Sequence, residues 1–169
     1  MNQGSEIVPR LGVRKQAILN AGGSVFDMAV AMLETKGMIA NYPFGDVYPN
    51  GQPKIDDAAN FGIFKQCWLM IRSSVPQYAS LTAQQFRSGA AMNNNLSWDI
   101  QVLHASQRHY GMDRWIAGHR GGLSGLNGTW SQNDIINYRT AINWIQSQIN
   151  SNAKFRADDT RFWVDVPPV

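Results

Sequence analysis

Helix-start signals recur along this chain, and they constrain its fold more than any other feature of the sequence. A Ser or Thr followed three residues later by an acid or amide can satisfy the free N–H groups of a helix's first turn. The pattern occurs at Ser24 with Asp27, Thr82 with Gln85, and Ser131 with Asp134. No sustained period-2 run of β-branched residues indicates strands. We therefore predict a mainly α fold.

Apolar spacing predicts four of the helices. Residues 25–33, VFDMAVAML, are apolar on nearly every side, which is typical of a short helix buried in the core. Residues 55–72 are predicted as one helix, because Phe61, Phe64, Trp68 and Ile71 follow 3-4-3 spacing. Two later helices are marked by helical spacing at Leu96, Ile100 and Leu103, and at Ile135, Tyr138, Ile142, Ile145 and Ile149. Between them, the glycine-rich residues 118–130, GHRGGLSGLNGTW, are expected to form turns.

Composition excludes several functional classes. With 169 residues, 44% of them hydrophobic, the chain suits a single domain over residues 1–169, with flexible termini at 1–8 and 165–169. Its net charge of +3 is scattered, so no nucleic-acid partner is expected. No apolar run approaches the roughly 20 residues of a membrane span. The three histidines have no acidic cluster beside them, so neither a metal nor another cofactor is expected. The single Cys67 is expected to be buried and inert.

Two carboxyl residues flank a turn-rich loop. Glu34, one of only two glutamates, ends the apolar run, and Asp46 follows a Tyr-Pro-Phe-Gly turn. Burial at the helix end is expected to raise the pKa of Glu34, whereas Asp46 is expected to be hydrated and ionised. Such a pair would suit a glycoside hydrolase, which needs one protonated and one ionised carboxyl. On these grounds alone, a solvated helix-end acid and a turn former stay the ordinary alternative.

Aromatic residues near polar ones are the second functional signal. Sugar rings have apolar faces and polar rims, so their binding sites combine Trp or Tyr with amides, Arg and His. Tyr42, Tyr110 and Trp115 are expected in or beside loops, near polar residues that include His119 and Arg120. Core packing is the alternative for each, and it is preferred for Trp68 and Trp144.

Three stretches of this sequence resemble glycoside hydrolase family 134, the endo-β-1,4-mannanases. They are MLETKGMIANYPFGD at 32–46, KIDDAANFGIFKQCWLMIR at 54–72 and WIAGHRGGLSG at 115–125. The resemblance implies a lysozyme-like fold with a substrate cleft, and internal cleavage of β-1,4-mannan with inversion of configuration. By position, Glu34 matches the general acid and Asp46 the general base.

The matching stretches also suggest which residues bind the sugar. Donors, acceptors and aromatic faces identify the substrate-binding candidates, which are Tyr42, Asn60, Lys65, Trp115, His119 and Arg120. The implied partners are β-1,4-mannan and manno-oligosaccharides, bound by a monomer. Since a polymeric mannan cannot enter a cell, the resemblance implies an extracellular, secreted protein.

Two other functions stay open from the sequence. A lysozyme-like peptidoglycan hydrolase would share the helical fold and the Glu at a helix end, because a fold does not fix the substrate. A non-catalytic carbohydrate-binding module would suit the aromatic residues equally well.

Overall fold

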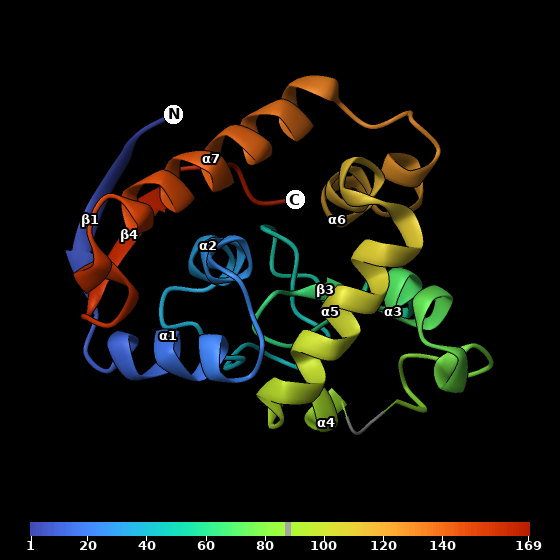
Figure 1. Ribbon diagram of the computed structural model, residues 1–169. Coiled ribbons are helices and arrows are strands. Elements are labelled where there is room, and N and C mark those ends of the chain that lie inside the picture. The colour runs from blue at the N-terminus through green and yellow to red at the C-terminus, as the bar shows by residue number, and fades with distance from the viewer. Residues whose placement is uncertain (87–88) are drawn as a thin grey trace.

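Helices form most of the structure, as predicted (Figure 1). The computed structural model describes residues 1–86 and 89–169. Its α-helices are α1 Leu11–Asn20, α2 Val25–Glu34, α3 Trp68–Ser74, α4 Gly89–Asn93, α5 Leu96–Tyr110, α6 Met112–Leu126 and α7 Gln132–Asn150. Single 3₁₀ turns lie at η1 Asp56–Ala58, η2 Pro76–Tyr78 and η3 Ala153–Arg156. The strands are β1 Gln3–Ile7, β2 Asn60–Phe61, β3 Gln66–Cys67 and β4 Thr160–Val164.

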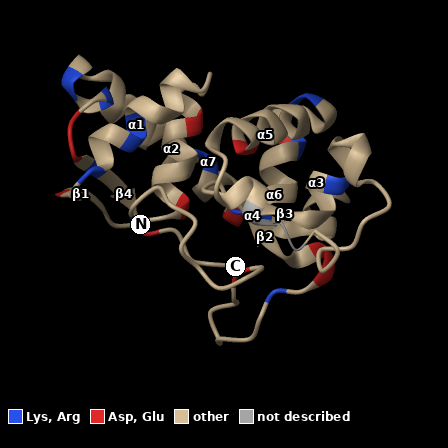
Figure 2. Cartoon of the chain, turned by 90° about the horizontal axis from the view of Figure 1, so that it is seen from below, with Lys and Arg blue, Asp and Glu red and all other residues tan. Residues whose placement is uncertain are grey.

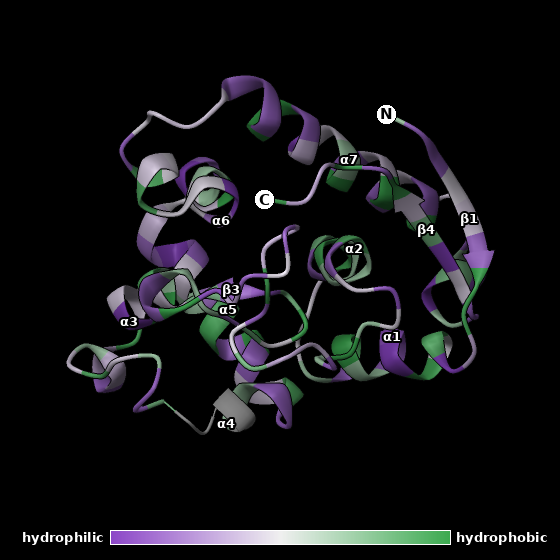
Figure 3. Ribbon diagram, turned by 180° about the vertical axis from the view of Figure 1, so that it is seen from behind, coloured by the Kyte–Doolittle hydropathy of each residue, from purple (hydrophilic) through white to green (hydrophobic). Residues whose placement is uncertain are grey.

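Helix α2 is the buried central helix, and it ends at Glu34. It begins at the predicted Ser24, whose hydroxyl accepts from the Asp27 N–H while the Asp27 carboxylate accepts from the Ser24 N–H. Residues Met28 to Met32 are all buried, and α7 packs against the helix. In Figure 3 hydrophobic colouring dominates α2, consistent with burial on nearly every side. The sequence prediction for this helix is confirmed.

The other two predicted caps lead into different structures. Ser131 accepts from the Asp134 N–H and starts α7, as predicted. Thr82 and Gln85 exchange the expected pair of hydrogen bonds, but they begin only a turn. A capping pattern therefore identifies the local turn, whereas the helix beyond it depends on packing.

Residues 55–72 do not form one helix, so that prediction is wrong. The η1 turn is followed by the β2–β3 hairpin, and only α3 from Trp68 onward is helical. The hairpin buries Phe61 and Phe64 as fully as a helix would. Positive φ angles of 79° at Gly62 and 49° at Lys65 turn the chain back on itself. A 3-4-3 spacing of apolar residues indicates that they are buried, and here a short hairpin buries them instead of a helix.

Strands β1 and β4 bring the two ends of the chain together, which local patterns did not predict. They pair antiparallel, from Gln3 opposite Val164 to Ile7 opposite Thr160. The Asp165 N–H also donates to the Asn2 carbonyl. These bonds join residues 2–7 to residues 160–165, which overlap the termini predicted as flexible at 1–8 and 165–169.

The glycine-rich stretch is mostly helical, so the prediction of turns is wrong for residues 118–126. It continues α6 to Leu126, with a kink at Gly122, where φ is 56° and ψ is −133°. A Cβ at Gly125 would stand 1.8 Å from the Ala117 carbonyl oxygen. Glycine at position 125 lets the part of α6 after the kink pack closely on the part before it. In the sequence, the same glycines favoured turns.

Two hydrophobic clusters make up the core. Cluster 1 contains α2 and the inner faces of α6 and α7, with Trp115 and Tyr138 fully buried in it. Cluster 2 contains one face each of α3 and α5, with Phe61 and Trp68 among its members. The β2–β3 hairpin spans both clusters, because its Ile63, Phe64 and Cys67 belong to cluster 1. Charged residues are spread over separate elements (Figure 2). Among the described residues, no helix combines the length and apolarity needed to cross a bilayer.

Candidate active site

Glu34 is held at the end of α2 by side chains from two distant helices. Its Oε1 lies 2.9 Å from His119 Nε2 on α6 and accepts a 2.5 Å hydrogen bond from the Tyr138 hydroxyl on α7. Its side chain is 14% exposed, and Oε2 makes no hydrogen bond within the described part of the chain. One oxygen is therefore fixed, and the other is left for a ligand.

The pKa of Glu34 is lowered, so the predicted direction is wrong. Burial raises the pKa, but the charge of His119, the hydrogen bonds from His119 and Tyr138, and the charge of Arg120 together outweigh it. The sequence prediction considered the apolar neighbours along α2 and lacked these partners, which come from α6 and α7.

Asp46 is buried, contrary to the prediction of a hydrated loop residue. It is only 4% exposed, and its backbone adopts φ of 69°. Oδ2 lies 3.0 Å from Lys65 Nζ and accepts from Asn60 Nδ2, while Oδ1 accepts from the Val47 N–H. A carboxylate suits these three donors, so protein groups replace the water expected from the sequence.

The β2–β3 hairpin brings three of the predicted site residues together. Asn60 lies on β2 and Lys65 in the turn, and both contact Asp46. Tyr42 donates to the Gly62 carbonyl, and its ring lies 5.0 Å from Lys65 Nζ. Tyr42 therefore supports the lysine beside Asp46, and its hydroxyl is already engaged.

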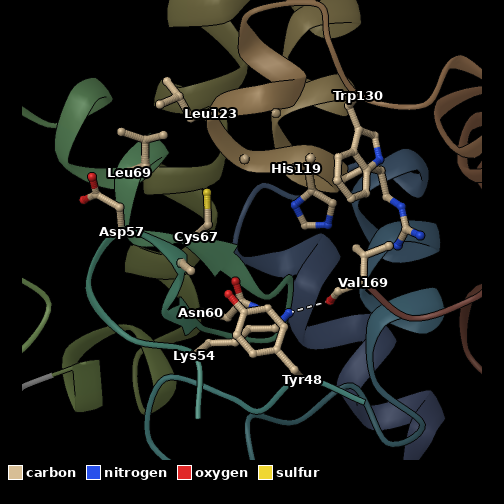
Figure 4. Close-up of a pocket in the computed structure, with 15 residues that line it drawn as sticks. Tyr48, Lys54, Asp57, Asn60, Cys67, Leu69, His119, Leu123, Trp130 and Val169 are labelled. Atoms are coloured by element: carbon tan, nitrogen blue, oxygen red, sulfur yellow. Dashed lines mark hydrogen bonds between the residues drawn. The ribbon is translucent and has the colours of Figure 1, made fainter. Parts of the chain in front are cut away.

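An open pocket of about 380 Å³ lies between the partners of the two carboxyls (Figure 4). His119, the partner of Glu34, lines one side, and Asn60, the partner of Asp46, lines another. Tyr48 and Trp130 add aromatic surface, as Figure 4 shows. This combination of polar groups and aromatic rings suits a sugar.

Lys54 lies within the electrostatic reach of both carboxyls. Burial lowers its pKa, and the charges of Asp46 and Glu34 oppose that shift. Both carboxylates also add to the effect of burial in raising the pKa of Tyr42. The charges of Glu34 and Asp46 thus both act on Lys54 and Tyr42.

The C-terminal residues form part of the pocket wall. Lys54 Nζ donates to the Val169 carbonyl at 2.7 Å, the dashed line in Figure 4. Arg120 Nη2 donates to the Pro167 carbonyl at 2.7 Å. Two cations beside the pocket are thereby engaged with the backbone of the chain's last residues.

The side chains of Trp115 and Arg120 are engaged with other protein groups. Trp115 is 1% exposed, and its ring stacks on His119 with centroids 5.0 Å apart. Arg120 lines the pocket but makes a two-bond pair with Asp134. Both therefore support the residues around Glu34. Tyr110 packs with His109, and neither lines this pocket.

Three residues of the site were missed by sequence reasoning. Tyr138 was assigned to the core of α7 by its spacing, yet a hydroxyl in a row of isoleucines is a signal that it needs a polar partner. Lys54 and Tyr48 lie in loop 47–54, which has no periodic pattern. Cys67 lines the pocket too, but burial raises the pKa of its thiol, which fits the expected inert residue.

Neither Glu34 nor Asp46 lines the pocket itself, but His119 and Asn60, which contact them, do. An open pocket lined by polar groups and aromatic rings, with carboxyls behind its lining, suits an enzyme that hydrolyses glycosidic bonds. The chain belongs to glycosyl hydrolase family 134, whose sequence model matches residues 12–166. It is thus a glycoside hydrolase, and its substrate class is the polysaccharides. A comparison with curated proteins found no match.

Proposed function

We propose that the protein hydrolyses internal β-1,4-mannosidic bonds of mannan with inversion of configuration. Glu34 is the general acid and Asp46 the general base. The observation that carries this proposal is the pocket lined by a direct partner of each carboxyl, His119 for Glu34 and Asn60 for Asp46. Membership of family 134 supports the bond type, because the resemblance noted in the sequence is to endo-β-1,4-mannanases.

Glu34 has one carboxyl oxygen fixed by hydrogen bonds and one free to deliver a proton. With Oε1 accepting from Tyr138 and His119, a proton on Oε2 is free to pass to the departing glycosidic oxygen. Because the pKa of Glu34 is lowered, its protonated form is populated mainly at the acidic end of the pH–rate profile. A bound sugar that displaces water strengthens the burial effect, which acts in favour of that form.

Asp46 has hydrogen-bond partners that orient it as a general base. Lys65, Asn60 and the Val47 N–H orient its carboxylate, which takes a proton from the water attacking the anomeric carbon. Inversion needs roughly 6.5–9.5 Å between the two carboxyls, so that this water fits beneath the sugar.

The remaining proposals concern architecture and setting. We propose that the fold is lysozyme-like, with the substrate cleft between cluster 1 and cluster 2. The protein acts outside the cell, because its polymeric substrate cannot cross a membrane. It acts there as a monomer. Its partners are β-1,4-mannan and manno-oligosaccharides.

The decisive experiment is hydrolysis of purified mannan followed by NMR before the product mutarotates. We expect manno-oligosaccharides whose first-formed reducing ends are α-anomers, the inverted form. First-formed β-anomers would refute inversion. Lysis of bacterial cell walls without cleavage of mannan would favour the peptidoglycan hydrolase instead.

Isosteric amides test the two catalytic roles. Glu34→Gln and Asp46→Asn should each lower kcat by about 10²- to 10⁴-fold while oligosaccharide binding persists, because each removes proton transfer with little change in volume. Normal activity in either variant would disprove that residue's role. If wild type and both variants bind mannan equally without cleaving it, the protein is a binding module.

A further inference from the structure

Asp99 is a buried carboxyl that the catalytic proposal does not use. It lies in the first turn of α5 and is 0% exposed. No salt bridge pairs it with a cation among the described residues. A buried carboxyl is costly unless its hydrogen bonds serve a purpose, so its contacts indicate what it does.

The side-chain hydrogen bonds of Asp99 among the described residues are to the β2–β3 hairpin. Oδ2 accepts from the Ile63 N–H at 2.8 Å, and Oδ1 accepts from Gln66 Nε2 at 2.8 Å. The same Gln66 amide donates to the Asp99 carbonyl at 3.1 Å. A Cβ at Gly62 would stand 2.2 Å from Asp99 Oδ1, so the turn lies directly on the carboxylate. Asp99 thus fixes both ends of the turn.

The turn that Asp99 fixes carries the partners of Asp46. Lys65 lies within it, one residue before Gln66, and its Nζ is 3.0 Å from Asp46 Oδ2. Asn60 precedes the turn on β2 and donates to the same oxygen. The chain of contacts therefore runs from α5 through the turn to the Asp46 carboxylate.

We propose that Asp99 is a positioning residue, which sets the β2–β3 turn so that Lys65 and Asn60 orient the Asp46 carboxylate. The proposal rests on the proposed function, in which Asp46 is the general base. Asp99 touches neither the pocket nor Glu34. Its effect is on the geometry of the base, because misplacing a catalytic group by about 1 Å can cost on the order of 100-fold in rate.

Asp99→Ala is the variant that removes both acceptors. The Ile63 N–H and the Gln66 amide then lose their partner, and the turn shifts. We expect kcat on mannan to fall by about 10- to 100-fold, with KM changed by less than about threefold, because the pocket walls stay in place. Asp99→Asn should keep most of the activity. Its Oδ1 still accepts from Ile63, and Gln66 Oε1, which is buried without a hydrogen-bond partner, is available for the introduced amide.

Lys15→Met provides the matched control. Lys15 is a fully buried charge that binds the Phe155 and Thr160 carbonyls and Asp158, away from the hairpin. Its loss should lower thermal stability as Asp99→Ala does, yet leave kcat unchanged below the melting temperature. An equal fall of kcat in both variants would reduce Asp99 to a general stability role and overturn the proposal.

A double-mutant cycle with Lys65→Met tests the route. If Asp99 acts through the turn, Asp99→Ala should cost much less in kcat when Lys65 is already absent. Costs that multiply independently would contradict this route.

NMR supplies a measurement that does not depend on catalysis. The side-chain amide signals of Asn60, which donate to Asp46, should move in Asp99→Ala and stay in place in Lys15→Met. If the Asn60 signals do not move in Asp99→Ala, the positioning role is overturned, even if the wild-type enzyme is fully active. Moved signals in a protein that never cleaves mannan would preserve the structural link and reject the proposed function.

Discussion

His119 Nε2 lies 2.9 Å from Glu34 Oε1, although the two residues are 85 positions apart in the sequence. This contact decides the charge on the candidate acid, because the charge and hydrogen bond of His119 are the largest influences that lower the pKa of Glu34. Burial acts in the opposite direction. The pH dependence of hydrolysis should therefore respond to His119.

His119→Gln should move the basic limb of the kcat/KM profile to higher pH. The change removes the imidazole charge, so the pKa of Glu34 rises and its acid form persists further. Tyr138→Phe removes a neutral hydrogen bond to the same oxygen and should move the limb the same way. Rates on manno-oligosaccharides across pH measure both. A limb that stays in place would show that another group limits the reaction.

Arg120→Met should destabilise the fold by about 3 kcal/mol, because it leaves the partly buried Asp134 and the Pro167 carbonyl without their partner. Urea unfolding measures this loss. Arg139→Met is the matched control. Its pair with Asp113 is exposed, so it should cost less than about 1 kcal/mol. Equal losses would contradict the structural role of Arg120.

Trp115→Ala and Tyr48→Ala should separate stability from substrate binding. Trp115 is buried, so its loss should cost about 3–5 kcal/mol of folding free energy. Tyr48 is 39% exposed and lines the pocket, so its loss should leave stability nearly unchanged. We expect KM for mannan to rise by roughly five- to tenfold in Tyr48→Ala, which corresponds to about 1 kcal/mol. Tyr48→Phe should retain the wild-type KM, and a comparable rise there would assign the effect to the hydroxyl.

Asp99→Asn should flatten the dependence of stability on pH. Burial raises the pKa of Asp99 to about 7, despite the hydrogen bonds from Ile63 and Gln66. Between the ordinary value of about 4 and that pH, the folded state binds the extra proton. Its stability therefore falls as pH rises, by at most about 1.4 kcal/mol per unit. Urea unfolding from pH 4 to 8 measures the slope, and an unchanged slope in the variant would place the titration elsewhere.

Sequence reasoning succeeded where a signal was local. The cap at Ser24 and the apolar run behind it predicted α2 and placed Glu34 at its end. The candidate pair of carboxyls could be named because both lie in one short stretch. The helices around Ile100 and Ile142 followed from spacing alone.

It failed where the outcome depended on distant partners. The β1–β4 pairing joins the two ends of the chain, and no pattern within either strand identifies its partner. The hairpin at Gly62 differs from the predicted helix, because Phe61 and Phe64 are buried in the two hydrophobic clusters and burial by a hairpin leaves the same apolar spacing as burial on a helix face. The pKa of Glu34 was misjudged because His119 and Tyr138 are remote in sequence.

The two carboxyls are held by parts of the structure that pack differently, Glu34 by cluster 1 alone and Asp46 by a hairpin that spans both clusters. Glu34 ends a helix of cluster 1, with Tyr138 of the same cluster bound to it, whereas Asn60, which holds Asp46, lies between Phe61 of cluster 2 and its strand partner Cys67 of cluster 1. The separation of Glu34 and Asp46 thus depends on how the hairpin packs between the two clusters. Substitutions that repack either cluster can widen or narrow the separation of the two carboxyls while the hydrogen bonds of each carboxyl stay intact. Core substitutions, at residues that no substrate contacts, can therefore change the spacing of the two carboxyls during evolution.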